Sequence, residues 1–175
     1  MLLAADHVAT ERLLTDSGVP QVLLGNSFYA ELFTGQLSSC LKHGFVGAVG
    51  DVEISLAARS DYAEAAAEVL ALDRHQGAVY ELGGETVTKT GLAEVITAAT
   101  GRQVSYVNLP ADQYQVALEG AGLTARLPYI LANIDRGIGL GELQVDNGHL
   151  EKLLGRSATP PTEVFADTAA AASQR

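Results

Sequence analysis

The residues of this chain best suited to chemistry stand in the loop Asn26-Ser27-Phe28-Tyr29, directly after the apolar run Val22–Leu24. The side-chain amide of Asn26 can both donate and accept hydrogen bonds, so it can pair with another amide such as a carboxamide. Phe28 and Tyr29 offer flat apolar faces for a ring such as a nicotinamide or a quinone. Hydride transfer between two bound rings needs alignment more than an acid or a base. The loop therefore suits hydride transfer; in the alternative interpretation Phe28 is a core residue, Tyr29 is half-buried and Asn26 belongs to a turn.

Three other groupings are weaker candidates. His7 and Glu11 lie one helical turn apart, so they can bind a metal, relay a proton or form an ordinary surface pair. Gly83-Gly84 follows an expected strand and precedes an expected helix, so its amides can cradle an anion, although the third glycine of a phosphate loop is missing. The glycines within 137–141 follow a helical pattern and indicate a flexible break. The remaining histidines lack metal-ligand spacing, so no metal site is predicted.

The candidate loop must be positioned by the strand that precedes it. Apolar side chains at helical spacing indicate a helix over residues 5–16, and Gly18 ends it. Pro20 then starts a short strand over 21–24. In doubly wound folds ligands lie beyond the carboxyl ends of the strands, which makes 25–29 the first place to expect a site.

Beyond this loop the chain alternates between expected helices and strands. Residues 45–49 and 53–57 can pair as a hairpin around Gly50-Asp51. This alternation predicts an α/β fold, although only the strand near residue 24 has the placement expected in a parallel sheet. The other expected elements are short helices over 28–34 and 36–43, helices over 61–71, 88–100 and 111–120, strands over 79–82 and 103–109, and helical spacing from 123 to 154.

Several helices carry more detailed expectations. Ser60 is expected to cap the helix over 61–71, and Asp146 the helix that ends at Gly155. The tail from Asp167 onward is rich in alanine and polar residues and is expected to fray. The inward face of the helix over 61–71 is predicted to be Ala63, Ala66, Ala67 and Leu70, and that of the helix over 88–100 to be Leu92, Val95, Ile96 and Ala99.

Composition narrows the classes of function. The 175 residues carry 11 basic and 21 acidic side chains, and the net charge of −10 would repel a phosphate backbone, so no nucleic acid partner is expected. Cys40 is the only cysteine, which excludes a disulfide framework within the chain and favours a reduced, cytoplasmic setting. No apolar run approaches the roughly 18 residues needed to span a bilayer, so no membrane partner is expected.

Four motifs in order resemble a known family. The run VLLGNSFYAE over residues 22–31 resembles the LLRNGWYxEN signature of the NmrA-like atypical short-chain dehydrogenases, in their NAD(P)H:quinone oxidoreductase type 2 branch. The segments HVATE (7–11), ARSDYA (58–63) and VYELGG (79–84) are similar to that family's HxxTE, TRADYA and YELAG motifs. The resemblance covers nearly the whole chain apart from its tail.

The resemblance implies an enzyme that carries hydride from NADPH to a quinone. In the family, the loop that matches residues 25–31 lies near the cofactor, and Arg59 would reach the cofactor or the loop that covers it. The catalytic residues stay unknown. The residues implied to line the nicotinamide side are Asn26, Ser27, Phe28, Tyr29, Ala30 and Glu31.

The resemblance also implies which part of the fold is present. The family's glycine-rich half, which binds the cofactor pyrophosphate at a helix N-terminus, is absent from this sequence. We therefore expect the C-terminal part of an NAD(P)-binding Rossmann-type fold: a sheet edge with the cofactor-side loop over 1–35, a mixed α+β substrate-side region over 36–166, and a disordered tail over 167–175. Gly25 stands where the family has arginine, which removes a charged group that can hold phosphate.

Two functions follow from these observations. The first is an NAD(P)H-dependent quinone reductase, or the C-terminal part of one, with a quinone-like substrate. The alternative is a non-enzymatic NmrA-like remnant that binds a small molecule or a partner. An apolar strand left at a sheet edge favours association, either with a second copy of the chain or with a complementing N-terminal half.

Overall fold

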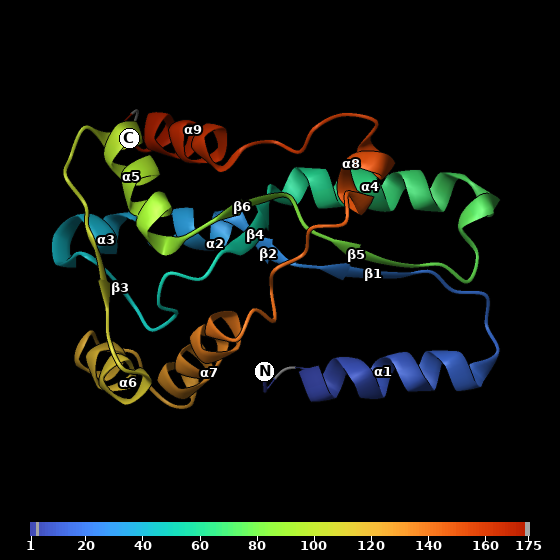
Figure 1. Cartoon of the computed structure of the whole chain (residues 1–175), viewed down its shortest axis with the longest axis horizontal. Coiled ribbons are helices and arrows are strands. Elements are labelled where there is room, and N and C mark those ends of the chain that lie inside the picture. The colour runs from blue at the N-terminus through green and yellow to red at the C-terminus, as the bar shows by residue number, and fades with distance from the viewer. Residues whose placement is uncertain (3, 174–175) are drawn as a thin grey trace.

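The computed structural model describes residues 1–2 and 4–173 (Figure 1). The predicted α/β alternation is confirmed. The strands are β1 (Leu23–Asn26), β2 (Phe28–Tyr29), β3 (Phe45–Gly47), β4 (Ile54–Ala57), β5 (Val79–Leu82), β6 (Glu85–Val87) and β7 (Tyr106–Asn108). The helices are α1 (Ala4–Ser17), α2 (Ala30–Thr34), α3 (Leu37–His43), α4 (Arg59–Ala71), α5 (Lys89–Thr100), α6 (Ala111–Gly120), α7 (Leu127–Gly139), α8 (His149–Leu154) and α9 (Pro161–Ser173), with a 3₁₀ turn over Asp73–His75.

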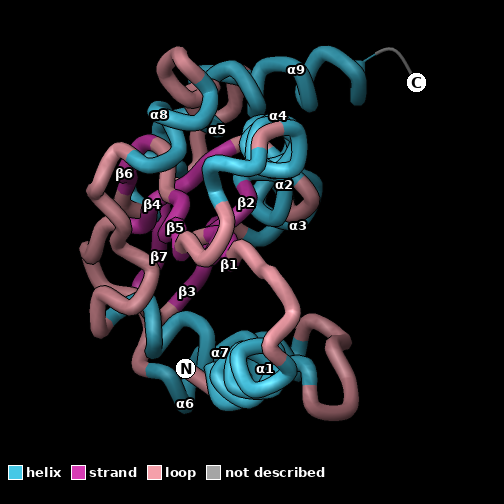
Figure 2. Tube along the Cα trace, turned by 90° about the vertical axis from the view of Figure 1, so that its right-hand side faces the viewer, coloured by secondary structure: helices cyan, strands magenta, loops and turns pink. Residues whose placement is uncertain are grey.

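The strands lie between two layers of helices. Figures 1 and 2 show α4, α5, α8 and α9 on one side of the strands and α1, α6 and α7 on the other. In the described part of the chain, β1 pairs with β5 and β3 with β7, both in parallel, while β4 lies between a parallel β2 and an antiparallel β6. The strand that precedes the candidate loop therefore does belong to a parallel pair, and two further parallel pairs accompany it.

The hairpin predicted for 45–49 and 53–57 is wrong. β3 pairs with β7, and β4 pairs with β2 and β6. All four residues of β4 are buried, as in a strand covered on both faces, whereas a surface hairpin would alternate between buried and exposed positions. Gly50 does adopt a positive φ of 70°, but the turn it makes leads into a different sheet.

Two hydrophobic clusters hold the layers together. The larger joins α2, α3, α5 and α9 to β3 and β4, and the smaller joins α4 and α8 to β5. The predicted inward face of α5 is confirmed, because Leu92 and Ile96 are fully buried and Val95 and Ala99 pack against the larger cluster. Chain segments far apart in sequence thus share one core.

The inward face predicted for α4 is wrong. Its buried side chains are Asp61, Tyr62, Ala65 and Val69, and Leu70 is 87% exposed. The buried carboxylate of Asp61 is held by partners on the α8–α9 connection, so it fixes which side of the helix faces inward. The helix also begins one residue before the expected Ser60 cap.

Other helix ends differ from the predictions as well. α7 continues through Gly137 to Gly139, so the expected break comes only at Leu140. The side chain of Asn147, rather than that of Asp146, accepts a hydrogen bond from the first backbone N–H of α8. Residues 167–173 are helical where a disordered tail was predicted, and residues 174–175 lie outside the described residues.

The N-terminal helix α1 confirms the helix predicted for residues 5–16, but every one of its residues is exposed. Its start is tied to α7, because the backbone N–H of Leu2 donates to Asn133 Oδ1 (2.6 Å) and the N-terminal ammonium pairs with Glu142 (2.6 Å). Among the described strands β1 pairs with β5 alone, so its other edge is open. The division of the chain at residue 35 stays a prediction, and the β1–β5 and β2–β4 pairs join its two sides.

None of the helices that the structure describes has both the length and the apolar character to cross a membrane.

Candidate functional site

The candidate loop is held in place at the end of β1 by hydrogen bonds of Ser27. The backbone N–H of Ser27 donates to the carbonyl of Leu82 at 2.8 Å, and its hydroxyl donates to the carbonyl of Leu143 at 3.0 Å. These two bonds hold a buried serine between β5 and the segment after α7. The chain on either side is thereby turned so that Asn26 and Tyr29 meet, with Asn26 Nδ2 donating to the Tyr29 hydroxyl at 3.1 Å.

Tyr29 is the centre of the site. Its ring meets the edge of the Tyr62 ring at a centroid distance of 5.1 Å and 86°, and the Arg59 guanidinium lies 5.7 Å from its centroid. The Tyr62 hydroxyl is buried beneath, and burial raises its pKa above the ordinary value. The Tyr29 ring thus packs against the edge of Tyr62, and the Arg59 guanidinium lies over it.

Glu31 connects the loop to the start of α4. Both of its carboxylate oxygens accept from the backbone N–H of Arg59, at 2.9 and 3.1 Å. The carboxylate therefore acts as a cap from outside the helix, in the position where the helix dipole favours negative charge. We call the group Asn26, Tyr29, Glu31 and Arg59 the Asn26 site.

The structure separates the predicted site residues into two sets. The members of the Asn26 site come together on a surface that is exposed at Asn26 and Arg59 and partly buried at Tyr29 and Glu31. Ser27, Phe28 and Ala30 face inward: Ala30 is 1% exposed, and the Phe28 ring packs on Phe33 at a centroid distance of 5.4 Å. Phe28 therefore packs against the core, as the alternative interpretation predicted. Ser27, Phe28 and Ala30 support the Asn26 site from the side of the core.

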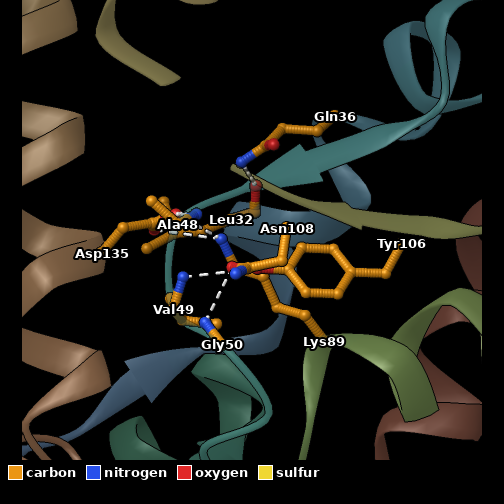
Figure 3. A network of polar contacts seen from close by, with 9 residues as sticks. All are labelled: Leu32, Gln36, Ala48, Val49, Gly50, Lys89, Tyr106, Asn108 and Asp135. Carbon is orange, nitrogen blue, oxygen red and sulfur yellow. Dashed lines mark hydrogen bonds and ion pairs between the residues drawn. The ribbon is translucent and has the colours of Figure 1, made fainter. Parts of the chain in front are cut away.

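A second polar centre, which sequence reasoning missed, lies between α5 and α7 (Figure 3). Lys89 Nζ lies 3.0 and 2.8 Å from the two carboxylate oxygens of Asp135, and the backbone N–H of Ala48 donates to the same carboxylate at 2.7 Å. The side chains of Lys89 and Asp135 are only 3% and 8% exposed. Burial lowers the pKa of Lys89, and Asp135 opposes that shift.

Aromatic rings enclose this ion pair. The Lys89 ammonium lies 5.7 Å from the ring centroids of Phe45 and Tyr114 and 5.9 Å from that of Tyr106. Gly47 passes so close that a Cβ there would collide with the ends of the Lys89 and Asp135 side chains, so a larger residue would displace the ion pair. One sequence signal was available: Asp135 stands among the apolar side chains of the predicted helical stretch, where a lone carboxylate needs a partner.

The ion pair positions the turn after β3. The N–H of Val49 donates to the Tyr106 hydroxyl (3.3 Å), that of Gly50 donates to Asn108 Oδ1 (2.8 Å), and the Tyr106 hydroxyl donates to the same Asn108 oxygen (3.0 Å). Together with the Ala48–Asp135 bond, three successive backbone amides are held by side chains from α7 and β7, as Figure 3 shows.

The buried tyrosines predict a loss of stability in alkali. Burial raises the pKa of Tyr106 from 10 to about 12, and it also raises the pKa of Tyr62 and Tyr114. Between pH 10 and 12 the folded chain keeps protons that the unfolded chain has lost, so the free energy of unfolding should fall as pH rises through this range. Urea denaturation at pH 9, 10 and 11 measures how the free energy of unfolding depends on pH. The lowered pKa of Lys89 contributes to this dependence with the opposite sign.

The variant Tyr106→Phe is the control for this titration. It should show a shallower decline than the parent chain, because one raised pKa is removed. A decline of equal steepness in both proteins would contradict the assignment.

Two of the histidines that appear isolated in sequence meet at Tyr80. Arg74 Nε donates to His75 Nε2 at 3.2 Å, so the His75 proton resides on Nδ1, which donates to the Tyr80 hydroxyl at 2.8 Å. The Tyr80 ring also meets the edge of the His149 ring at a centroid distance of 5.6 Å. Within the described residues no group of three or more histidine, cysteine or acidic side chains could hold a metal ion.

Comparison with known proteins shows which proteins this chain resembles. No protein-family model matches the chain. The chain is 42% identical over 163 residues to quinone oxidoreductase 2 of Escherichia coli, a match that covers 92% of the chain and 57% of the relative. It is 26% identical over 161 residues to an NmrA-like family domain-containing oxidoreductase of Aspergillus flavus, covering 90% of the chain and 52% of that protein.

The solved structures agree with the sequence relatives. The crystal structure of the NADPH-dependent quinone oxidoreductase of E. coli, complexed with NADPH, superimposes with a TM-score of 0.91 at 40% identity. That alignment covers 94% of this chain and 59% of the E. coli chain. The chain is therefore a homologue of quinone oxidoreductase 2 and the NmrA-like oxidoreductases, and it spans somewhat more than half of their length.

Proposed function

We propose that the chain supplies the substrate-side part of an NADPH-dependent quinone reductase, with the Asn26 site facing the nicotinamide. The observation that carries this proposal is the meeting of four side chains from four elements, β1, β2, α2 and α4, at the carboxyl end of β1. In doubly wound folds ligands bind at such strand ends. The E. coli homologue superimposes on this chain in a form complexed with NADPH.

Each residue of the Asn26 site has a role that its geometry suits. Asn26 offers its amide to a carboxamide, while the Tyr29 hydroxyl fixes the orientation of that amide. The exposed Arg59 guanidinium lies over the Tyr29 ring, which supports it, and offers a charged fork to a phosphate. Glu31 holds the start of α4 so that Arg59 remains over Tyr29. When bound, the cofactor would supply the hydride, and these residues would align it with the acceptor.

We further propose that a second polypeptide segment covers β1 and supplies the phosphate-binding part of the cofactor site. The open edge of β1 can accept another parallel strand, and the exposed α1 lies on the same side of the strands as α7 (Figures 1 and 2). The apolar side chains of Leu13, Val19 and Val79 are 72%, 61% and 58% exposed, which is area that such a segment would bury. A cytoplasmic location and a quinone acceptor are part of the same proposal.

The test is a fluorescence titration with NADPH of two proteins. The first is the chain as given, and the second is the chain fused behind the portion of the E. coli homologue that it does not match. We expect no saturation at millimolar NADPH for the first, and micromolar binding with quinone reduction for the second. A fusion that folds but binds no NADPH would overturn the proposed function. The alternative, a non-enzymatic remnant that binds a small molecule or a partner, would then be favoured.

Variants of the fusion test the Asn26 site directly. We expect Arg59→Ala and Asn26→Ala each to lower kcat/KM by about 10- to 100-fold, because each variant loses one hydrogen bond to the cofactor, and this is the usual effect of such a loss. Arg126→Ala, which removes an exposed arginine at the start of α7, is the matched control and should leave kcat/KM unchanged. Equal activity in all three variants would show that the cofactor binds elsewhere.

A further inference from the structure

A cavity of about 360 Å³ lies between α3, β3 and α6. Its volume falls at the lower end of the range of small-molecule sites, about 300–1,000 Å³. It shares no residue with the Asn26 site. Its lining includes Gln36, Ser39, Cys40, His43, Phe45, Tyr114 and Ala117.

The inner wall of the cavity is preformed. Phe45, Cys40 and Tyr114 are 2%, 5% and 8% exposed, so each is fixed by packing on its far side. Phe45 also meets the edge of the Phe33 ring at 6.0 Å, within the larger hydrophobic cluster. Two fixed aromatic side chains favour a flat apolar ligand, because little side-chain freedom is lost on binding.

The charge behind this wall selects among flat ligands. Phe45 and Tyr114 separate the cavity from the Lys89 ammonium, which lies 5.7 Å from both ring centroids. The Lys89 ammonium behind the rings attracts oxygen atoms that carry partial negative charge. Because the Asp135 carboxylate balances the charge of Lys89, no net positive charge is left to bind a full anion. A neutral ring with phenol or carbonyl oxygen is therefore favoured over a full anion.

The rim supplies hydrogen-bonding groups for such oxygens. Gln36, Ser39 and His43 line the cavity from α3 and the residue before it. Gln36 Nε2 donates to the carbonyl of Leu32 at 3.2 Å, which holds the Gln36 side chain against α2, as Figure 3 shows. Apolar walls with a few convergent polar groups are the usual composition of a ligand site.

We propose that this cavity binds a small, neutral, flat aromatic molecule with phenol or carbonyl oxygens, at a site separate from the Asn26 site. The inference does not depend on the proposed reductase activity, because it rests on the residues that line the cavity and on the Lys89–Asp135 pair behind them. α2 runs from Glu31 of the Asn26 site toward Gln36 at the cavity rim, so the two sites lie at opposite ends of one short helix.

The test is a titration of the chain with 2-naphthol, followed by the fluorescence of the probe. We expect saturable binding with a Kd below about 1 mM, which corresponds to about 4 kcal/mol. Ala117→Phe, which fills the cavity from α6, should weaken binding at least tenfold. Val116→Phe on the same helix is the matched control, because Val116 is 66% exposed and does not line the cavity.

Cys40 gives a second measurement that locates the probe. It is the only cysteine of the chain and lines the cavity, and burial raises the pKa of its thiol, so labelling by N-ethylmaleimide should be slow. Bound 2-naphthol should slow it further in the parent chain and in Val116→Phe. The proposal is overturned if no saturation appears, if Ala117→Phe folds and binds as well as Val116→Phe, or if Asn26→Ala abolishes binding.

Discussion

Replacing Asp135 by alanine is expected to lower the free energy of unfolding by about 3–5 kcal/mol, the usual cost of leaving one partner of a buried ion pair alone. The Lys89 side chain, which is only 3% exposed and lies among aromatic rings, would lose its carboxylate partner. The N–H of Ala48 would lose its acceptor at the same time. Urea denaturation of the parent and variant chains measures the difference.

Two further variants identify the cause of that loss. The double variant Lys89→Met with Asp135→Leu removes both charges and keeps similar volume, so it should recover most of the stability. Glu68→Ala breaks the ion pair with Arg74, whose side chain is 66% exposed, and should cost less than about 1 kcal/mol. If Asp135→Ala cost no more than Glu68→Ala, the buried pair would not stabilise the turn after β3.

Replacing Asp61 by alanine is the second change with a large expected effect, again about 3–5 kcal/mol. The Asp61 side chain is fully buried and accepts three hydrogen bonds: from Arg156 Nη2 (2.8 Å), from the backbone N–H of Thr159 (2.6 Å) and from the Thr159 hydroxyl (3.1 Å). These bonds fasten the connection between α8 and α9 to the first turn of α4. Loss of the carboxylate leaves the buried N–H of Thr159 without this acceptor and frees the connection.

The chain offers a matched control for Asp61. Glu64 lies one turn further along α4 and pairs with the same Arg156, but its side chain is 52% exposed. Glu64→Ala should therefore cost less than about 1 kcal/mol. Hydrogen exchange distinguishes the two variants, since amides between Gly155 and Thr159 should exchange faster in Asp61→Ala only. Equal exchange in both variants would mean that Arg156 alone fastens the connection.

The elements that could be predicted from the sequence are those whose signal is local. α5 has apolar side chains at helical spacing and a Thr88 cap that accepts from Gly91, so both its bounds and its inner face follow from pattern alone. α4 has the same spacing in alanine on several faces, and the decisive residue is the buried Asp61, whose partners lie nearly a hundred residues later. The pairing of β3 with β7 is equally non-local, so a nearby turn wrongly suggested a hairpin.

The grouping of the Asn26 site could be predicted for the same reason, whereas its role toward a cofactor stays a prediction. Three of the four members of the Asn26 site lie within six residues of one another, and Arg59 begins the helix after β4, so a contiguous motif and one helix start were sufficient. The Lys89–Asp135 pair was not predictable, because the two residues lie 46 positions apart and only the tertiary structure brings them together.

The parallel strand pairs also decide when the chain can fold as it is synthesised. A parallel pair requires a long crossover, and β1 can take its place only after β5, with Leu23 opposite Val79. β3 must likewise await β7, with Phe45 opposite Tyr106. Non-local pairs of this kind form slowly, in about milliseconds to seconds. A nascent chain that has emerged only as far as α4 therefore holds both β1 and β3 without their partners, and both strands are then open to chaperones that bind apolar segments.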